Sequence, residues 1–129
     1  MPNTKTVEVS HLGGITAAYQ TSGNIDKSKP TLVLVNSFTT SSELYHDAYS
    51  NKELTSVMNL VAIELLGHGQ TRAHIARNWT YWDTAIMNLQ VMEKLGIEKA
   101  FVLGTSQGGW ITVRMALMRP DKVNWLAGI

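Results

Sequence analysis

The sequence has no cysteine and only three prolines among 129 residues. Without cysteine there is no disulfide, no thiolate nucleophile and no cysteine-ligated zinc site. The formal net charge is only +1, so charge gives no argument for a nucleic-acid or anionic-membrane partner. No apolar run is long enough to span a bilayer, and the first residues lack the apolar core of a secretory signal. We therefore expect a cytoplasmic protein without nucleic-acid or membrane partners.

The length of the chain and its alternation of strand-like and helical segments are those of a single α/β domain, residues 1–129. Two strand-like segments, 6–11 and 15–21, flank a Leu-Gly-Gly hairpin signal. Further strand-like apolar runs cover residues 31–35, 58–65, 99–105 and 123–129. Helical patterns lie between them, at about 41–56, 82–92 and 107–118. This alternation predicts a mostly parallel sheet with helices on both faces, preceded by an antiparallel hairpin.

Two of the helical patterns carry further expectations. The first is expected to begin at Ser41 or Ser42 as its N-cap and to continue without a break to about residue 56. The last, residues 107–118, is apolar nearly all round apart from Arg114, so we expect it to be deeply buried.

A glycine-flanked serine lies between an apolar strand-like run and the helical pattern after it, in Phe-Val-Leu-Gly-Thr-Ser-Gln-Gly-Gly-Trp over residues 101–110. A sharp strand-to-helix turn lifts the Ser106 hydroxyl clear of the backbone but imposes strained backbone angles. Gly104 and Gly108 lack Cβ atoms, so strand and helix can approach closely. Because the first amides of a helix have no acceptor within it, the Gln107 N–H is the natural first donor to an oxyanion. We expect Ser106 to be partly exposed and strained.

Three other interpretations compete for this stretch. A plain turn without chemistry stays open, because Gly-x-Ser-x-Gly alone occurs often by chance. A dinucleotide-binding loop is disfavoured, because Ser106 stands where that fingerprint needs its middle glycine and the stretch does not follow the first strand. A phosphate-binding P-loop is excluded, because no Gly-Lys-Ser or Gly-Lys-Thr is present. The position between strand and helix favours a nucleophile elbow.

Four segments, in this order, resemble the α/β-hydrolase fold superfamily. Asn36-Ser37-Phe38 follows an apolar strand where the family has His-Gly-Phe. Residues 64–71, Glu-Leu-Leu-Gly-His-Gly-Gln-Thr, look like the family's Asp-x-x-Gly-His-Gly-x-Ser. The serine stretch is similar to its Gly-x-Ser-x-Gly-Gly, and Arg-Pro-Asp-Lys-Val at 119–123 resembles the usual link into the next strand. The resemblance covers the N-terminal half of such a domain and implies an incomplete, apparently truncated α/β-hydrolase fold.

The resemblance also implies roles for particular residues. Ser106 would be the nucleophile, with the Gln107 N–H as one oxyanion donor and the Phe38 N–H as the second. Asn36-Ser37 replaces the family's His-Gly, and if position 37 needs a positive φ, a serine there is strained. Serine rather than aspartate at position 106 argues against dehalogenases and epoxide hydrolases of the same fold.

The family's catalytic acid and histidine have no counterpart in the chain. In this fold they follow the serine, yet only Asp121 and no histidine comes after Ser106, and Asp121 falls in the family's linker. His68, in Gly-His-Gly, is expected to hydrogen-bond the backbone of its own turn rather than act as a base. The other histidines are expected to be solvated on the surface or distant from the serine: His46, His74 and His11.

These features predict a serine hydrolase that acts on a small-molecule carboxylic ester, thioester or lactone through an acyl-enzyme, without a cofactor or metal. An acyltransferase would use the same chemistry. The alternative is a non-catalytic truncated fragment, or a module that pairs with another chain. Three tryptophans are expected to make core and cap contacts rather than a ligand cage: Trp79, Trp82 and Trp110. The segment from Val123 to Ile129 is expected to be an apolar edge strand through which the chain self-associates.

Overall fold

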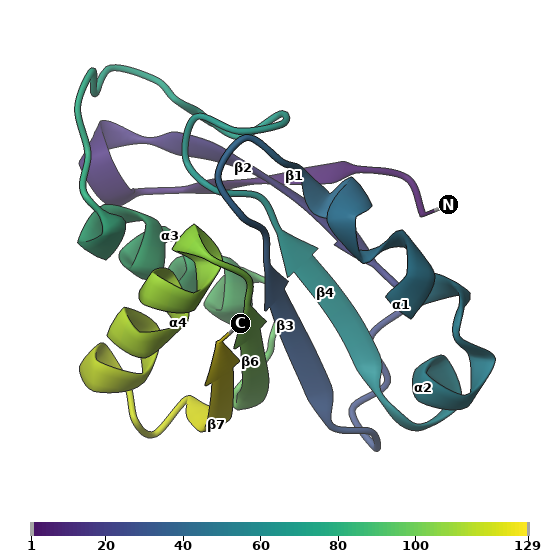
Figure 1. The fold of residues 1–129 in the computed structure, drawn as a ribbon. Helices are drawn as coiled ribbons and strands as arrows, with labels where there is room; N and C mark the ends of the chain where they lie inside the picture. The colour runs from purple at the N-terminus through teal and green to yellow at the C-terminus, as the bar shows by residue number, and fades with distance from the viewer. Residues whose placement is uncertain (1, 129) are drawn as a thin grey trace.

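The computed structural model describes residues 2–128, and of residues 125–128 the backbone alone. One mixed sheet has the strand order β1-β2-β4-β3-β6-β7 (Figure 1). The short strand β5 pairs with β2. The strands are β1 (Lys5–Val9), β2 (Ile15–Thr21), β3 (Thr31–Val35), β4 (Asn59–Ile63), β5 (Arg72–Ala73), β6 (Ala100–Gly104) and β7 (Val123–Gly128). The strands β4, β3, β6 and β7 are parallel, whereas β2 is antiparallel to its neighbours β1, β4 and β5. The hairpin followed by a parallel sheet is confirmed.

Helices cover both faces of this sheet (Figure 1). The helical elements are η1 (His11–Gly13), η2 (Ser42–Tyr45), α1 (His46–Ser50), α2 (Lys52–Val57), α3 (Tyr81–Lys94) and α4 (Gln107–Met118). Successive residues of β3 point to opposite faces: Val33 and Val35 pack in the larger core with α3 and α4, and Leu34 packs in the smaller one with η2 and α1. A strand covered on both faces is apolar throughout, which is why residues 31–35 were recognisable. No helix among the described residues is long and apolar enough to cross a membrane.

The expected single helix over residues 41–56 is wrong. The chain forms the three short elements η2, α1 and α2 instead. Ser41 does cap the first of them, since its hydroxyl accepts the Glu43 N–H at 3.3 Å. Asn51 then leaves the helical region, at φ −81° and ψ 101°, and its side-chain oxygen accepts the Leu54 N–H at 3.1 Å. Asparagine favours this capping geometry over a helix interior, so it ends one helix and begins the next.

The expected deep burial of α4 holds for one face only. Its buried residues are Gly108, Ile111, Thr112 and Met115. On the opposite side Trp110 is 63% exposed and Leu117 is 69% exposed. The guanidinium of Arg114 stacks 5.0 Å from the ring centre of Trp82 and 5.5 Å from that of Tyr81. The apolar outer face of α4 therefore has little cover among the described residues.

None of these three tryptophans is a core residue, so the expected core contacts are wrong. Besides Trp110, Trp79 and Trp82 are 40% and 44% exposed. The Trp79 ring lies against Gly67, where a Cβ atom would collide with it. Trp82 occupies the first turn of α3 beneath the Arg114 guanidinium. Both rings thus cover backbone or a cation at the surface, which helical spacing alone does not reveal.

The strand β7 lies at one edge of the sheet and, among the described residues, pairs with β6 alone. Val123 is buried and Asn124 is exposed, whereas the side chains of Trp125, Leu126 and Ile129 lie outside the described residues. We predict that the chain self-associates through this edge, because a strand edge offers unpaired N–H and C=O groups to another strand. Light scattering on the eluting protein should give the mass of a dimer or larger, and Asn124→Lys, which adds a charge to the edge, should lower that mass. A monodisperse monomer that melts cooperatively would contradict the prediction.

Candidate active site

Ser106 occupies the bend between β6 and α4. Its backbone angles are φ 53° and ψ −115°, and it is one of three non-glycine residues with a positive φ in the described chain, with Leu12 and Thr39. Such angles are unfavourable for an L-residue by about 1–3 kcal/mol. The side chain is exposed. The expected strained, exposed serine at a strand–helix junction is confirmed.

Two glycines allow the bend to be this tight. A Cβ atom on Gly104 would collide with the carbonyl of Gly108. A Cβ atom on Gly108 would collide with the carbonyl of Val35 and crowd that of Asn36. The first turn of α4 therefore begins directly against β6 and the end of β3. The expected close approach at both glycines is confirmed.

Neither the Gln107 nor the Phe38 backbone N–H has an acceptor among the described residues. The next two amides of α4 are occupied, because Gly108 donates to the Thr105 carbonyl and Gly109 to the Ser106 carbonyl, both at 2.9 Å. Phe38 follows β3 by three residues and is 64% exposed. Both N–H groups are thus available to a ligand.

The loop that carries Phe38 is closed by Asn36. The Asn36 Nδ2 donates to the Thr40 carbonyl at 2.8 Å, and its Oδ1 accepts the Leu65 N–H at 3.3 Å. Thr40 N–H donates back to the Ser37 carbonyl at 3.2 Å. The positive φ of 64° falls on Thr39 and not on Ser37, so the condition under which Ser37 would be strained is not met. A positive φ at the third residue alone of the turn from 37 to 40 is the pattern of a type II turn.

A buried carboxylate, not singled out from the sequence as a site residue, joins this region to the next loop. Glu64 is 3% exposed, and its Oε1 accepts the Ser42 hydroxyl at 2.8 Å and the Ser42 N–H at 3.2 Å. Its Oε2 accepts the Gln70 N–H at 2.8 Å. The sequence does indicate a buried carboxylate, because Glu64 is the one charged residue in the apolar run 57–66. A buried acid needs such partners, so Glu64 fixes the loops after β3 and β4 together.

His68 lies in the second of these loops. Its Nδ1 donates to the Leu66 carbonyl at 3.0 Å, as a turn histidine should, and that expectation is confirmed. The ring packs edge-on against Phe38, with 5.6 Å between ring centres. His68 therefore supports the loop that carries the unpaired Phe38 N–H.

The remaining histidines are placed away from the serine. His11 Nε2 lies 2.8 Å from Asp83 Oδ1, between η1 and α3. His74, directly after β5, has its Nε2 3.1 Å from Oε2 of Glu8 in β1, and His46 is exposed at the first residue of α1. The Ser106 side chain makes no cap hydrogen bond to α4. The structure brings no histidine into a hydrogen bond with Ser106 among the described residues.

The one acid after the serine is paired elsewhere. Asp121 Oδ1 and Oδ2 accept hydrogen bonds from Arg119 Nε and Nη2 at 2.9 and 2.7 Å. This hydrogen bonding by Arg119 holds the pKa of Asp121 at about 2. Both residues lie beyond the C-terminal end of α4, and Ser106 precedes its N-terminal end. Asp121 is therefore a surface ion-pair partner and not an acid positioned for Ser106.

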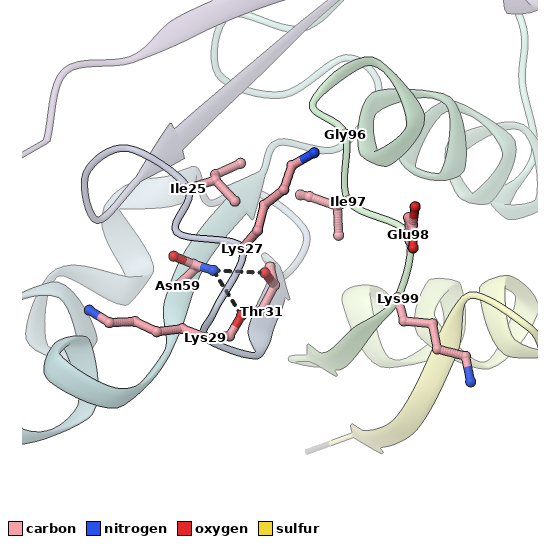
Figure 2. A pocket seen from close by; sticks show the side chains of 9 residues that line it. All are labelled: Ile25, Lys27, Lys29, Thr31, Asn59, Gly96, Ile97, Glu98 and Lys99. Carbon is pink, nitrogen blue, oxygen red and sulfur yellow. Dashed lines mark hydrogen bonds between the residues drawn. The ribbon is translucent and has the colours of Figure 1, made fainter.

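A cavity of about 270 Å³ lies at the other end of the sheet, where β3 and β4 begin (Figure 2). Three lysines line it, Lys27, Lys29 and Lys99, but their ammonium groups point away from one another in Figure 2. Asn59 Nδ2 already donates to the Thr31 hydroxyl at 3.1 Å. No cluster of histidine and acidic side chains with the geometry of a metal site occurs in the described part of the chain. The edge that carries Ser106 is thus the better candidate for a site.

The strain at position 106 leads to a stability prediction. Ser106→Gly should be more stable than Ser106→Ala by about 1 kcal/mol, because glycine accepts a positive φ without a Cβ penalty. Part of the gain is offset by the greater freedom of glycine in the unfolded chain. Urea unfolding followed by circular dichroism measures the difference. An alanine variant at least as stable as the glycine variant would show that Ser106 is not strained.

Comparison with known proteins identifies the family to which the protein belongs. The sequence profile of the alpha/beta hydrolase fold family matches residues 30–129. Because this match covers most of the chain, the protein belongs to the alpha/beta hydrolase fold family. Human epoxide hydrolase 4 is 29% identical over 100 residues, which are 76% of this chain and 27% of that protein. The dihydrolipoyllysine-residue acetyltransferase component of the acetoin cleaving system of Cupriavidus necator is 34% identical over 70 residues, 54% of this chain and 18% of that protein.

Solved structures share the fold over nearly the whole chain. A "probable hydrolytic enzyme" of Pseudomonas aeruginosa PAO1 superposes with a TM-score of 0.87 at 18% identity, over 99% of this chain and 41% of that one. Epoxide hydrolase A of Mycobacterium thermoresistibile superposes with a TM-score of 0.80 at 20% identity, over 98% of this chain and 39% of that one. The chain thus spans about two fifths of these structures.

Proposed function

We propose that the protein is a serine hydrolase in which Ser106 attacks a carboxylic ester, thioester or lactone to form an acyl-enzyme. One observation supports this above the others: an exposed, strained serine stands at the start of a helix, next to an amide without an acceptor. Strain of this kind persists where the surrounding structure imposes it and is frequent at reactive sites. Family membership supports the same chemistry.

The chemistry follows from the groups at the bend. Ser106 Oγ would attack the carbonyl carbon, and the carbonyl oxygen would gain the negative charge. The N–H groups of Gln107 and Phe38, with the positive end of the α4 dipole, would stabilise this oxyanion. Collapse of the intermediate expels the alcohol or thiol and leaves the acyl group on Ser106, which water then hydrolyses. The serine proton must pass to a base, and no histidine of the described chain lies beside it.

The identity of residue 106 favours acyl over epoxide chemistry, although several of the matched proteins are named epoxide hydrolases. Attack of a serine hydroxyl on an epoxide would give an ether, which water does not cleave, whereas attack on an ester gives another ester. A relative named as an acetyltransferase component is compatible with acyl transfer by the same fold. The substrate class we propose is therefore a carboxylic acid derivative.

A second candidate is a non-catalytic fragment, or a module that pairs with another chain. The observation that favours it is the absence of a histidine beside Ser106 in the described chain. Such a protein would keep the strained strand–helix bend at Ser106 but would not turn over a substrate.

Acylation of the serine tests the proposal without requiring turnover. The purified chain would be incubated with an excess of para-nitrophenyl acetate, and intact mass followed by peptide mapping would locate the acetyl group. We expect one acetyl group on Ser106, none in Ser106→Ala, and an unchanged result in Ser41→Ala, whose serine is also near the surface. Acetylation confined to lysines and the N-terminus, the same in all three proteins, would overturn the proposed function.

A further inference from the structure

A tyrosine hydroxyl lies beneath the bend, on the side of the sheet opposite α4. Tyr45 is the last residue of η2 and is 8% exposed. Its hydroxyl donates to the Val35 carbonyl at 2.6 Å. The same hydroxyl oxygen lies 3.2 Å from Thr105 Oγ1. Because the tyrosine hydrogen is used on the carbonyl, the Thr105 hydroxyl is the donor of this second bond.

The Val35 carbonyl is where the two halves of the candidate site meet. It accepts a second hydrogen bond from the Thr105 N–H at 3.1 Å. The Cα of Gly108 rests directly on it, so close that a Cβ atom would not fit. Val35 ends β3 and leads into the loop that carries Phe38, and Thr105 leads into Ser106 and Gln107. This one carbonyl therefore lies between the two segments that carry the Phe38 and Gln107 N–H groups.

We propose that Tyr45 is a positioning residue of the site: its hydroxyl holds the Val35 carbonyl and Thr105 in the arrangement that directs the Gln107 and Phe38 N–H groups at one oxyanion. This inference rests on the proposed function of Ser106. Tyr45 does not touch the substrate and moves no proton to it. Its effect belongs to the chemical step, because misplacing reacting groups slows a reaction without weakening substrate binding.

The environment of Tyr45 suits this task. Burial raises the pKa of the Tyr45 phenol, and the hydrogen bond with Thr105 offsets part of that rise. The phenol consequently stays neutral and keeps its hydrogen on the Val35 carbonyl at the pH of any ordinary assay. Removing the hydroxyl leaves a buried carbonyl with one partner fewer and frees the Thr105 side chain to rotate.

Tyr49 provides a matched control one helical turn away. It too is a tyrosine with a hydroxyl between two partners, donating to the Gln20 carbonyl at 3.0 Å and accepting the Ala62 N–H at 3.1 Å. These partners lie in β2 and β4, not at the bend. Tyr49→Phe therefore removes the same atom and the same kind of hydrogen bonds as Tyr45→Phe, without touching β3 or Thr105.

The experiment compares acetylation kinetics of Ser106 in the full chain, with para-nitrophenyl acetate as the probe. The first-order rate constant at saturating ester and the half-saturating ester concentration would be measured for wild type, Tyr45→Phe, Tyr49→Phe and Thr105→Val, with Ser106→Ala as background. We expect Tyr45→Phe to lower the rate constant about tenfold, or about 1.4 kcal/mol, with the half-saturating concentration unchanged. Thr105→Val should also lower the rate constant, and Tyr49→Phe should leave it at the wild-type value.

Three other outcomes would overturn the inference. Equal rate constants for wild type and Tyr45→Phe would leave Ser106 as the nucleophile but deny Tyr45 a positioning role. If Tyr45→Phe and Tyr49→Phe lower the rate constant equally, the substitutions act through the overall stability of the fold and not through the bend. If wild type is acetylated no faster than the Ser106→Ala background, the proposed function fails, and the role of Tyr45 fails with it.

Discussion

Replacing Gly108 by alanine should destabilise the chain by about 3 kcal/mol or more, out of the roughly 5–15 kcal/mol that holds a domain of this kind together. The added methyl group would meet the backbone carbonyls of Val35 and Asn36. A backbone atom in the centre of a sheet cannot rotate aside as a side chain can, so α4 would have to move away from β3. This movement of α4 would also open the bend at Ser106.

Urea unfolding measures this loss, and Gly23→Ala is the control. A Cβ atom on Gly23 meets nothing within 4 Å, although its φ of 144° disfavours a side chain. We expect Gly23→Ala to lose only about 1 kcal/mol, from backbone conformation alone. Similar losses in the two variants would mean that α4 does not pack against β3 as closely as the structure indicates.

The second large effect concerns turnover. We expect the chain to hydrolyse para-nitrophenyl acetate catalytically at no more than about 10⁻⁵ s⁻¹, roughly a millionfold below a typical enzyme. The described histidines are engaged at His11–Asp83, at the Leu66 carbonyl and at Glu8, or lie exposed on α1, so none of them is placed to take the Ser106 proton. The members of a catalytic triad act as a unit, and loss of the base removes most of the rate even when the serine and the oxyanion donors remain.

The assay follows release of para-nitrophenol by wild type beside Ser106→Ala, with and without added imidazole. Imidazole can accept the serine proton from solution, so it should raise the part of the rate that depends on Ser106. Turnover near 10 s⁻¹ without imidazole, abolished by Ser106→Ala, would be a rate typical of enzymes. It would mean that a histidine of this chain reaches the serine, and His68→Ala would then be the first variant to test.

The sequence predicted the parts of the fold that depend on local pattern. The apolar run of β3 and the Gly-x-Ser-x-Gly turn could be read directly, because burial on both faces and a tight strand–helix bend both restrict which residues fit. The break at Asn51 and the exposed face of α4 could not, because they depend on a cap and on which neighbours are present. Amino-acid composition predicts neither this break nor this exposed face.

The candidate site was predictable to a similar degree. Ser106, Gly104 and Gly108 follow from a short motif whose geometry is nearly fixed. Tyr45 and Glu64 act through contacts 60 and 22 residues away in the chain, so only the folded structure reveals them. The positive φ at Thr39 in place of Ser37 likewise depends on how the loop closes on Asn36, which residue types alone do not determine.

The central claim is that Ser106 is a nucleophile with two backbone donors aimed at its product. The most direct measurement is a crystal structure of the chain after prolonged reaction with an alkyl fluorophosphonate, whose adduct on serine carries an oxygen that stands in for the oxyanion. We predict a phosphorus bonded to Ser106 Oγ and a phosphonyl oxygen about 2.7–3.1 Å from both the Gln107 and the Phe38 nitrogen atoms. An unmodified Ser106, or an adduct whose phosphonyl oxygen faces solvent with neither amide in reach, would contradict it.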